Sequence, residues 1–175
     1  MRRKLALLPV LVGLAIVGAF AGGAWAVPDE QKPAASDLPD FLRPLAEADK
    51  IVVYSIDGTD RFEKKQAPKT EEEFRGYPVL GKLTIAAAKA RQEIVEAAKQ
   101  ATDKRDAARA KCFWPRHALH VEAKGKSVDY VICFQCSWFK VVDSKSVSDL
   151  GMQSHEKLQA VLNRHLKEAG IGLAP

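Results

Sequence analysis

The chain has 175 residues, of which 47% are hydrophobic and 28% are charged. This balance is typical of a globular domain, and it excludes collagen-like, low-complexity and wholly disordered chains. The net charge is +5, but Arg2, Arg3 and Lys4 supply three of these charges, which leaves +2 for the rest of the chain. A nucleic-acid-binding protein keeps a strong basic excess, so we expect no nucleic-acid partner.

The first 26 residues have the pattern of an export signal. Three basic residues precede a run without charge from Leu5 to Ala26, and that run closes on Ala24-Trp25-Ala26. This order predicts a bacterial signal peptide over residues 1–26, cleaved after Ala26, and therefore a periplasmic or secreted protein. The alternative is an uncleaved anchor, since 22 uncharged residues can just span a bilayer. Only an uncleaved segment would bring the protein to a membrane.

Residues 27–44 contain four prolines and little apolar content, which predicts an extended linker ahead of one domain over residues 45–175. The β-branched run Ile51–Ile56 predicts a first strand. The charged stretch 57–76 predicts a solvated loop, and Tyr77–Leu83 predicts a second strand.

The stretch Thr84–Arg109 predicts a long helix, because it is rich in helix-forming residues and has no Gly or Pro. Ile94 and Val95 lie on its apolar stripe and should pack on the sheet. Residues 112–142 predict a β-hairpin around residues 123–125, and residues 143–153 a polar loop. A final helix should run from Ser154 to Ala169, followed by Gly170 in a left-handed conformation.

The expected element order is therefore β-β-α-β-β-α. It predicts an α+β fold, a two-layer sandwich of one four-stranded antiparallel sheet with two helices on one face.

Three cysteines make up the most distinctive pattern in the sequence. Their number is odd, so an oxidising compartment would leave one of them unpaired. A three-residue loop at residues 123–125 would place Glu122 opposite Lys126 and Cys112 opposite Cys136. Opposed Cα atoms lie ~4.5–5.5 Å apart, which a disulfide accepts, so Cys112–Cys136 is the predicted disulfide. A two-residue loop would instead set Cys112 opposite Ser137.

The cysteines leave three interpretations open. The first is a structural Cys112–Cys136 disulfide with Cys133 as a buried thiol, and no cofactor. The second is a zinc site formed by Cys112, His117, Cys133 and Cys136, which requires a distorted strand at Pro115. The third is thiol–disulfide exchange between Cys133 and Cys136, although the residues after this motif look like a strand, whereas redox cysteines usually begin a helix.

Aromatic side chains are concentrated on the predicted hairpin. Trp114, Phe134 and Trp138, together with Arg116, form a possible recognition surface if their side chains are exposed. No nucleophile motif, paired carboxylates or phosphate loop accompanies His117 or the other histidines. We therefore expect no catalytic residue and no enzyme activity.

The segments Cys112–His117 and Val128–Cys136 resemble a group of uncharacterised exported bacterial proteins that share a C-F-x-P-R-H … I-C-F-x-C pattern. The resemblance covers roughly the last two-thirds of the chain, and it implies an architecture and no mechanism. The sequence as a whole predicts a small binding or structural module of the cell envelope, with an envelope or extracellular partner. The alternative is a metal-binding or thiol-redox protein that uses the cysteines.

Overall fold

The computed structural model describes residues 38–59, 72–102 and 112–174. The expected signal peptide, its cleavage site and residues 27–37 of the expected linker lie outside these ranges. The elements are α1 (Arg43–Ala46), β1 (Lys50–Ile56), β2 (Glu73–Phe74), β3 (Tyr77–Ile85), α3 (Ala88–Thr102), β4 (His117–Ala123), β5 (Lys126–Cys133), β6 (Trp138–Val142), β7 (Val147–Gly151) and α4 (Glu156–Glu168). No helix within the described ranges is long and apolar enough to span a bilayer.

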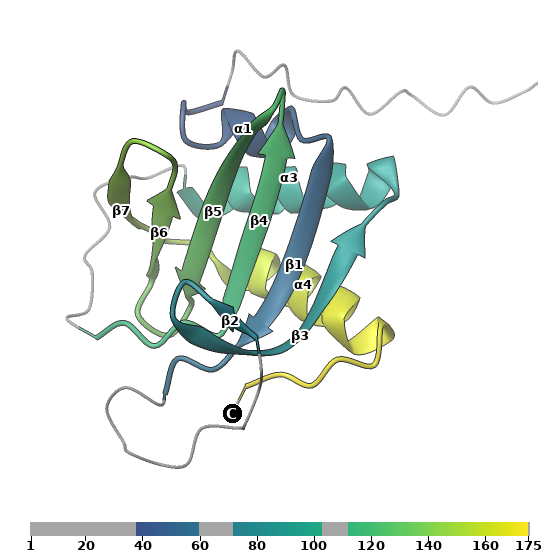
Figure 1. Ribbon diagram of the computed structural model, residues 1–175, viewed down its shortest axis with the longest axis vertical. Coiled ribbons are helices and arrows are strands. Elements are labelled where there is room, and N and C mark those ends of the chain that lie inside the picture. The colour runs from purple at the N-terminus through teal and green to yellow at the C-terminus, as the bar shows by residue number, and fades with distance from the viewer. Residues whose placement is uncertain (1–37, 60–71, 103–111, 175) are drawn as a thin grey trace, which may run out of the picture. The chain divides into compact units, whose positions relative to one another are not determined.

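The strands form one curled antiparallel sheet in the order β2-β3-β1-β4-β5-β6-β7. β1 lies inside the sheet and pairs with β3 on one side and with β4 on the other. In Figure 1, α3 and α4 lie behind the sheet, while the β2–β3 hairpin curls in front of it. The sheet therefore has one face covered by helices and a second face that the hairpin partly covers.

The predicted fold of a four-stranded sheet with two helices is wrong, because the described part of the chain has seven strands and three helices. β2 and β7 formed in stretches that looked like solvated loops, and α1 has only four residues. Strands this short and polar have no apolar pattern of their own. They form because a neighbouring strand pairs with their backbone, as β6 pairs with β7.

The two long helices bury the side chains that their sequence predicts. Ile94 is 0% and Val95 is 6% exposed, which confirms the buried face of α3. The helix begins at Ala88 rather than Thr84, because Thr84 and Ile85 still pair with β1. In α4 the predicted apolar stripe is buried, and Gly170 after it has the expected positive φ of 72°.

Residues 38–44, which belong to the expected linker, contribute to the same core. Leu38 is 3% and Leu42 is 1% exposed, and both belong to the apolar cluster between the sheet and the helices. The Tyr130 hydroxyl on β5 donates a 2.6 Å hydrogen bond to the carbonyl of Phe41. This part of the chain is therefore fixed against the sheet.

The turn between β4 and β5 differs from the predicted three-residue loop. Ala123 pairs with Lys126, so the loop has two residues, Lys124 and Gly125, with φ of 50° and 73°. Positive φ at both positions is the geometry of a tight hairpin turn. Glu122 then pairs with Ser127 rather than with Lys126, so the strands adopt the alternative register.

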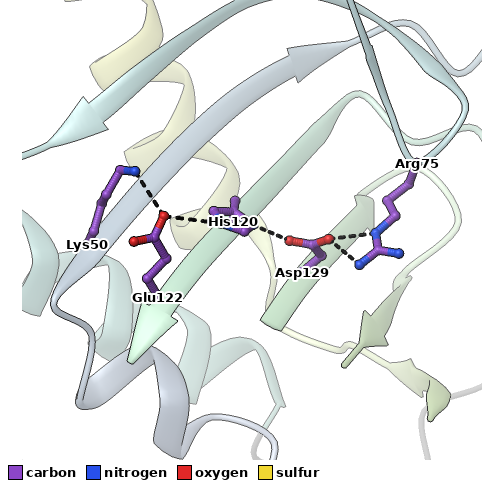
Figure 2. A network of polar contacts seen from close by, with 5 residues as sticks. All are labelled: Lys50, Arg75, His120, Glu122 and Asp129. Atoms are coloured by element: carbon purple, nitrogen blue, oxygen red, sulfur yellow. Dashed lines mark hydrogen bonds and ion pairs between the residues drawn. The ribbon is translucent and has the colours of Figure 1, made fainter. Parts of the chain in front are cut away.

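The face away from the helices carries a chain of polar side chains that crosses three strands and a turn (Figure 2). Lys50 contacts Glu122 at 2.9 Å, and Glu122 contacts His120 at 3.5 Å. Asp129 lies between His120, whose Nδ1 is 2.6 Å away, and the guanidinium of Arg75 at 2.5 Å. Arg75 belongs to the β2–β3 turn, so this ion pair holds the hairpin against β5.

Candidate functional site

The segment from Cys112 to Arg116 enters the sheet without forming a strand, and three contacts fix its path. The Trp138 indole donates a 2.9 Å hydrogen bond to the carbonyl of Cys112. The backbone of Arg116 joins both β1 and β5, because its carbonyl accepts from Ile56 and its N–H donates to Ile132. At Gly58 an added Cβ would overlap the carbonyl oxygen of Pro115, so the two backbones meet where only glycine fits.

The predicted Cys112–Cys136 disulfide is wrong, because all three cysteines are free in the structure. The sulfurs of Cys112 and Cys136 are 2.7 Å apart, against about 2.05 Å for an S–S bond. The register argument failed because the turn has two residues and the strand pairing of β4 ends at His117, five residues after Cys112. The predicted geometry therefore never applied to Cys112.

The environment of Cys112 and Cys136 favours the protonated form of these two thiols. The hydrogen bond with Cys136 and then burial raise the pKa of Cys112, and burial raises the pKa of Cys136. The sulfur of the buried Cys133 accepts a 3.2 Å hydrogen bond from the backbone N–H of Cys136. His117, the fourth residue of the proposed zinc set, instead contacts Asn163, and no three potential ligands among the described residues are grouped so as to hold a metal ion.

A pocket of about 340 Å³ opens beside this segment. Three of the four residues of the predicted recognition surface line it, namely Trp114, Arg116 and Phe134. The remaining lining residues are His117, Gln135, His155 and Gln159. Its volume lies within the ~300–1,000 Å³ that is usual for small-molecule sites.

Trp138, the fourth residue of that predicted surface, lies apart from the pocket. Its ring packs on Phe113 with the ring centroids 4.2 Å apart, and the ammonium of Lys140 lies 4.9 Å from the Trp138 centroid. The structure thus divides the predicted aromatic surface into a pocket and a separate aromatic pair.

Two histidine rings flank Phe134 in the pocket. The centroid of Phe134 is 5.1 Å from that of His117 and 5.6 Å from that of His155. His117 is 3% exposed, and its Nε2 lies 2.7 Å from Oδ1 of Asn163 on α4. An amide oxygen can only accept, so Nε2 carries the proton and Nδ1 is left with a lone pair. Burial lowers the pKa of His117 to about 4, so the ring is neutral near pH 7.

Three nitrogen atoms around the pocket are buried without a hydrogen-bond partner. They are Nε of Arg116, Nδ1 of His117 and Nδ1 of His155. Buried polar atoms are paired in the great majority of cases, and each exception needs an explanation. Three such atoms around one cavity distinguish this pocket from an ordinary surface hollow.

Gln135 and Gln159 did not stand out in the sequence, and His155 was expected to be a solvated residue of the final helix. His155 immediately precedes α4, and its Nε2 lies 3.3 Å from the hydroxyl of Ser137 in the β5–β6 turn. Gln135 comes from the β5–β6 turn, whereas His155 and Gln159 join the pocket because α4 lies against His117 at the start of β4, which no local pattern indicates. The sequence feature that came closest to indicating this pocket was the predicted cluster of aromatic residues that includes Phe134.

In comparisons with known proteins, no family model matches the chain, and no curated protein or solved structure is significantly similar to it.

Proposed function

We propose that the protein is a small binding module of the cell envelope, and that the pocket beside Trp114 holds a small ligand. The observation that carries this proposal is the set of unpaired buried nitrogens of Arg116, His117 and His155. A buried polar group without a partner costs about 1–3 kcal/mol, which a ligand atom that pairs with it recovers. The envelope location rests on the pattern of the first 26 residues.

The composition of the pocket supports binding rather than catalysis. The lining residues that the structure describes include no carboxylate and no serine or cysteine nucleophile. Its two aromatic rings offer an apolar wall, and its histidine, amide and guanidinium groups offer hydrogen bonds to a polar ligand. The three unpaired nitrogens are closed to water, so the proposed ligand has to displace a side chain that covers them.

The test is an NMR titration of the purified protein with three probes that share a phenyl ring and differ in charge. Benzyl alcohol is neutral, mandelate is an anion and benzylamine is a cation. At least one probe should produce saturable shifts of the Trp114 indole and of the His117 and His155 ring signals. The Trp138 indole, outside the pocket, should move little. Failure of all three probes to shift these signals would refute the proposed function.

A matched pair of variants on α4 shows whether such binding occurs in the pocket. Gln159→Phe places a ring in the pocket lining, whereas Lys157→Phe places the same ring on an exposed position two residues away. We expect Gln159→Phe to weaken the binding of the best probe at least tenfold and Lys157→Phe to leave it unchanged. Equal effects of the two variants would show that the probe binds elsewhere.

A further inference from the structure

Arg116 brings a positive charge to the pocket without a neutralising partner. No ion pair joins it to a carboxylate within the described ranges, and none of the described lining residues is acidic. A guanidinium that meets a carboxylate can form two parallel charge-assisted hydrogen bonds. The electrostatics of the lining therefore favour an anion over a neutral molecule or a cation.

The start of α4 adds to this preference. Its N-cap residue, His155, makes no side-chain capping hydrogen bond, and both His155 and Gln159 line the pocket. The first N–H groups of a helix have no partner within the helix and carry a partial positive charge. Glu156, the acidic residue of this first turn, is exposed and does not line the pocket.

His117 requires a different group of the ligand. Its Nε2–H is used by Asn163, so the unpaired Nδ1 can only accept a hydrogen bond. A carboxylate has no hydrogen to give, so an anion alone would leave this atom unpaired. A hydroxyl group next to the carboxylate supplies the donor. The low pKa of His117, caused by burial, keeps the ring in this accepting form near pH 7.

We propose that the pocket binds a hydroxy acid, with its carboxylate on Arg116, its hydroxyl donating to His117 and its carbon frame against Trp114 and Phe134. This inference rests on the proposed function, since it names the class of ligand for the same pocket. Aromatic hydroxy acids and sugar acids share this chemistry. Mandelate therefore serves as the probe for aromatic hydroxy acids, and glucuronate as the probe for sugar acids.

The experiment compares ligands that each lack one group. Mandelate carries ring, carboxylate and hydroxyl, phenylacetate lacks the hydroxyl, and benzyl alcohol lacks the carboxylate. By NMR titration of the wild-type protein at pH 7, the better of mandelate and glucuronate should bind at least tenfold more tightly than benzyl alcohol and several-fold more tightly than phenylacetate. Tighter binding of mandelate identifies the aromatic source, and tighter binding of glucuronate the sugar acid.

The role of Arg116 is tested with the variant Arg116→Gln and, as its matched control, Arg91→Gln on α3. In Arg116→Gln the hydroxy acid should bind no more tightly than benzyl alcohol, which should still bind. In Arg91→Gln the hydroxy acid should still bind more tightly than benzyl alcohol. Because the ligand comparison uses the wild-type protein, it decides the proposal even if Arg116→Gln does not fold. Benzyl alcohol or phenylacetate binding as tightly as the better of mandelate and glucuronate would overturn the hydroxy acid and leave the binding module intact. Failure of every probe would refute both.

Discussion

The buried His117 makes the free energy of unfolding of the protein depend on pH. Burial lowers its pKa from 6.5 to about 4, so in mildly acidic solution the unfolded chain binds a proton that the folded chain does not. Stability then rises with pH between these two values, and it is lost as the pH falls. One pKa unit corresponds to 1.36 kcal/mol, so lowering the pH from 7.5 to 4.5 should cost about 2–3 kcal/mol through His117 alone.

The measurement is urea unfolding of the wild type and of His117→Gln at several pH values between 7.5 and 4.5. Glutamine can keep the hydrogen bond to Asn163 and does not titrate, so the variant lacks the contribution of His117. Other groups titrate in both proteins, and the difference between the two free energies of unfolding isolates the histidine. We expect this difference to shrink by about 2–3 kcal/mol toward pH 4.5. Parallel pH profiles of the two proteins would refute the assignment of a buried, neutral His117.

Two further predictions concern packing. Gly58→Ala should lower the free energy of unfolding by about 1–3 kcal/mol or more, because the added Cβ would overlap the backbone of Pro115. Gly172→Ala is the control, since an added Cβ there has no atom within 4 Å, and it should change the free energy of unfolding little in the same urea titration. Ile94→Asp should lower the free energy of unfolding by at least about 4 kcal/mol, or unfold the protein, because it buries a charge. Glu96→Ala on the same helix should change the free energy of unfolding by no more than about 0.5 kcal/mol, measured by thermal unfolding. Similar effects of both variants would contradict the buried face of α3.

The parts of the fold that the sequence predicted are those with a strong pattern of their own. The β-branched run of β1 and the apolar stripes of α3 and α4 specify both the element and its buried face. β2 and β7 could not be predicted in this way, because a two-residue strand and an exposed edge strand depend on a partner strand. β6 was expected only as the end of the hairpin over residues 112–142 and not as a strand of its own. The number of strands was therefore underestimated, although the antiparallel pairing was expected.

The candidate site was accessible to sequence reasoning only in part. Trp114, Arg116 and Phe134 stood out as residue types typical of recognition, and the structure places all three around one pocket. His155 and Gln159 join them through the docking of α4, which is a long-range event. The disulfide was mispredicted from a strand pairing that does not extend to Cys112, and the sulfurs of Cys112 and Cys136 lie near each other without a bond.

The place of β1 between β3 and β4 has a consequence for the order in which the molecule folds. β1 forms a full antiparallel ladder with β4, whose residues lie more than sixty positions later in the chain, with β3 and α3 in between. Pairing over such a separation loses loop-closure entropy before the contacts between the strands form, and this loss slows folding. On the ribosome, the first half of the chain leaves one edge of β1 unpaired until β4 has been synthesised. The sheet is therefore completed late, and until then the unpaired edge is open to association with other chains.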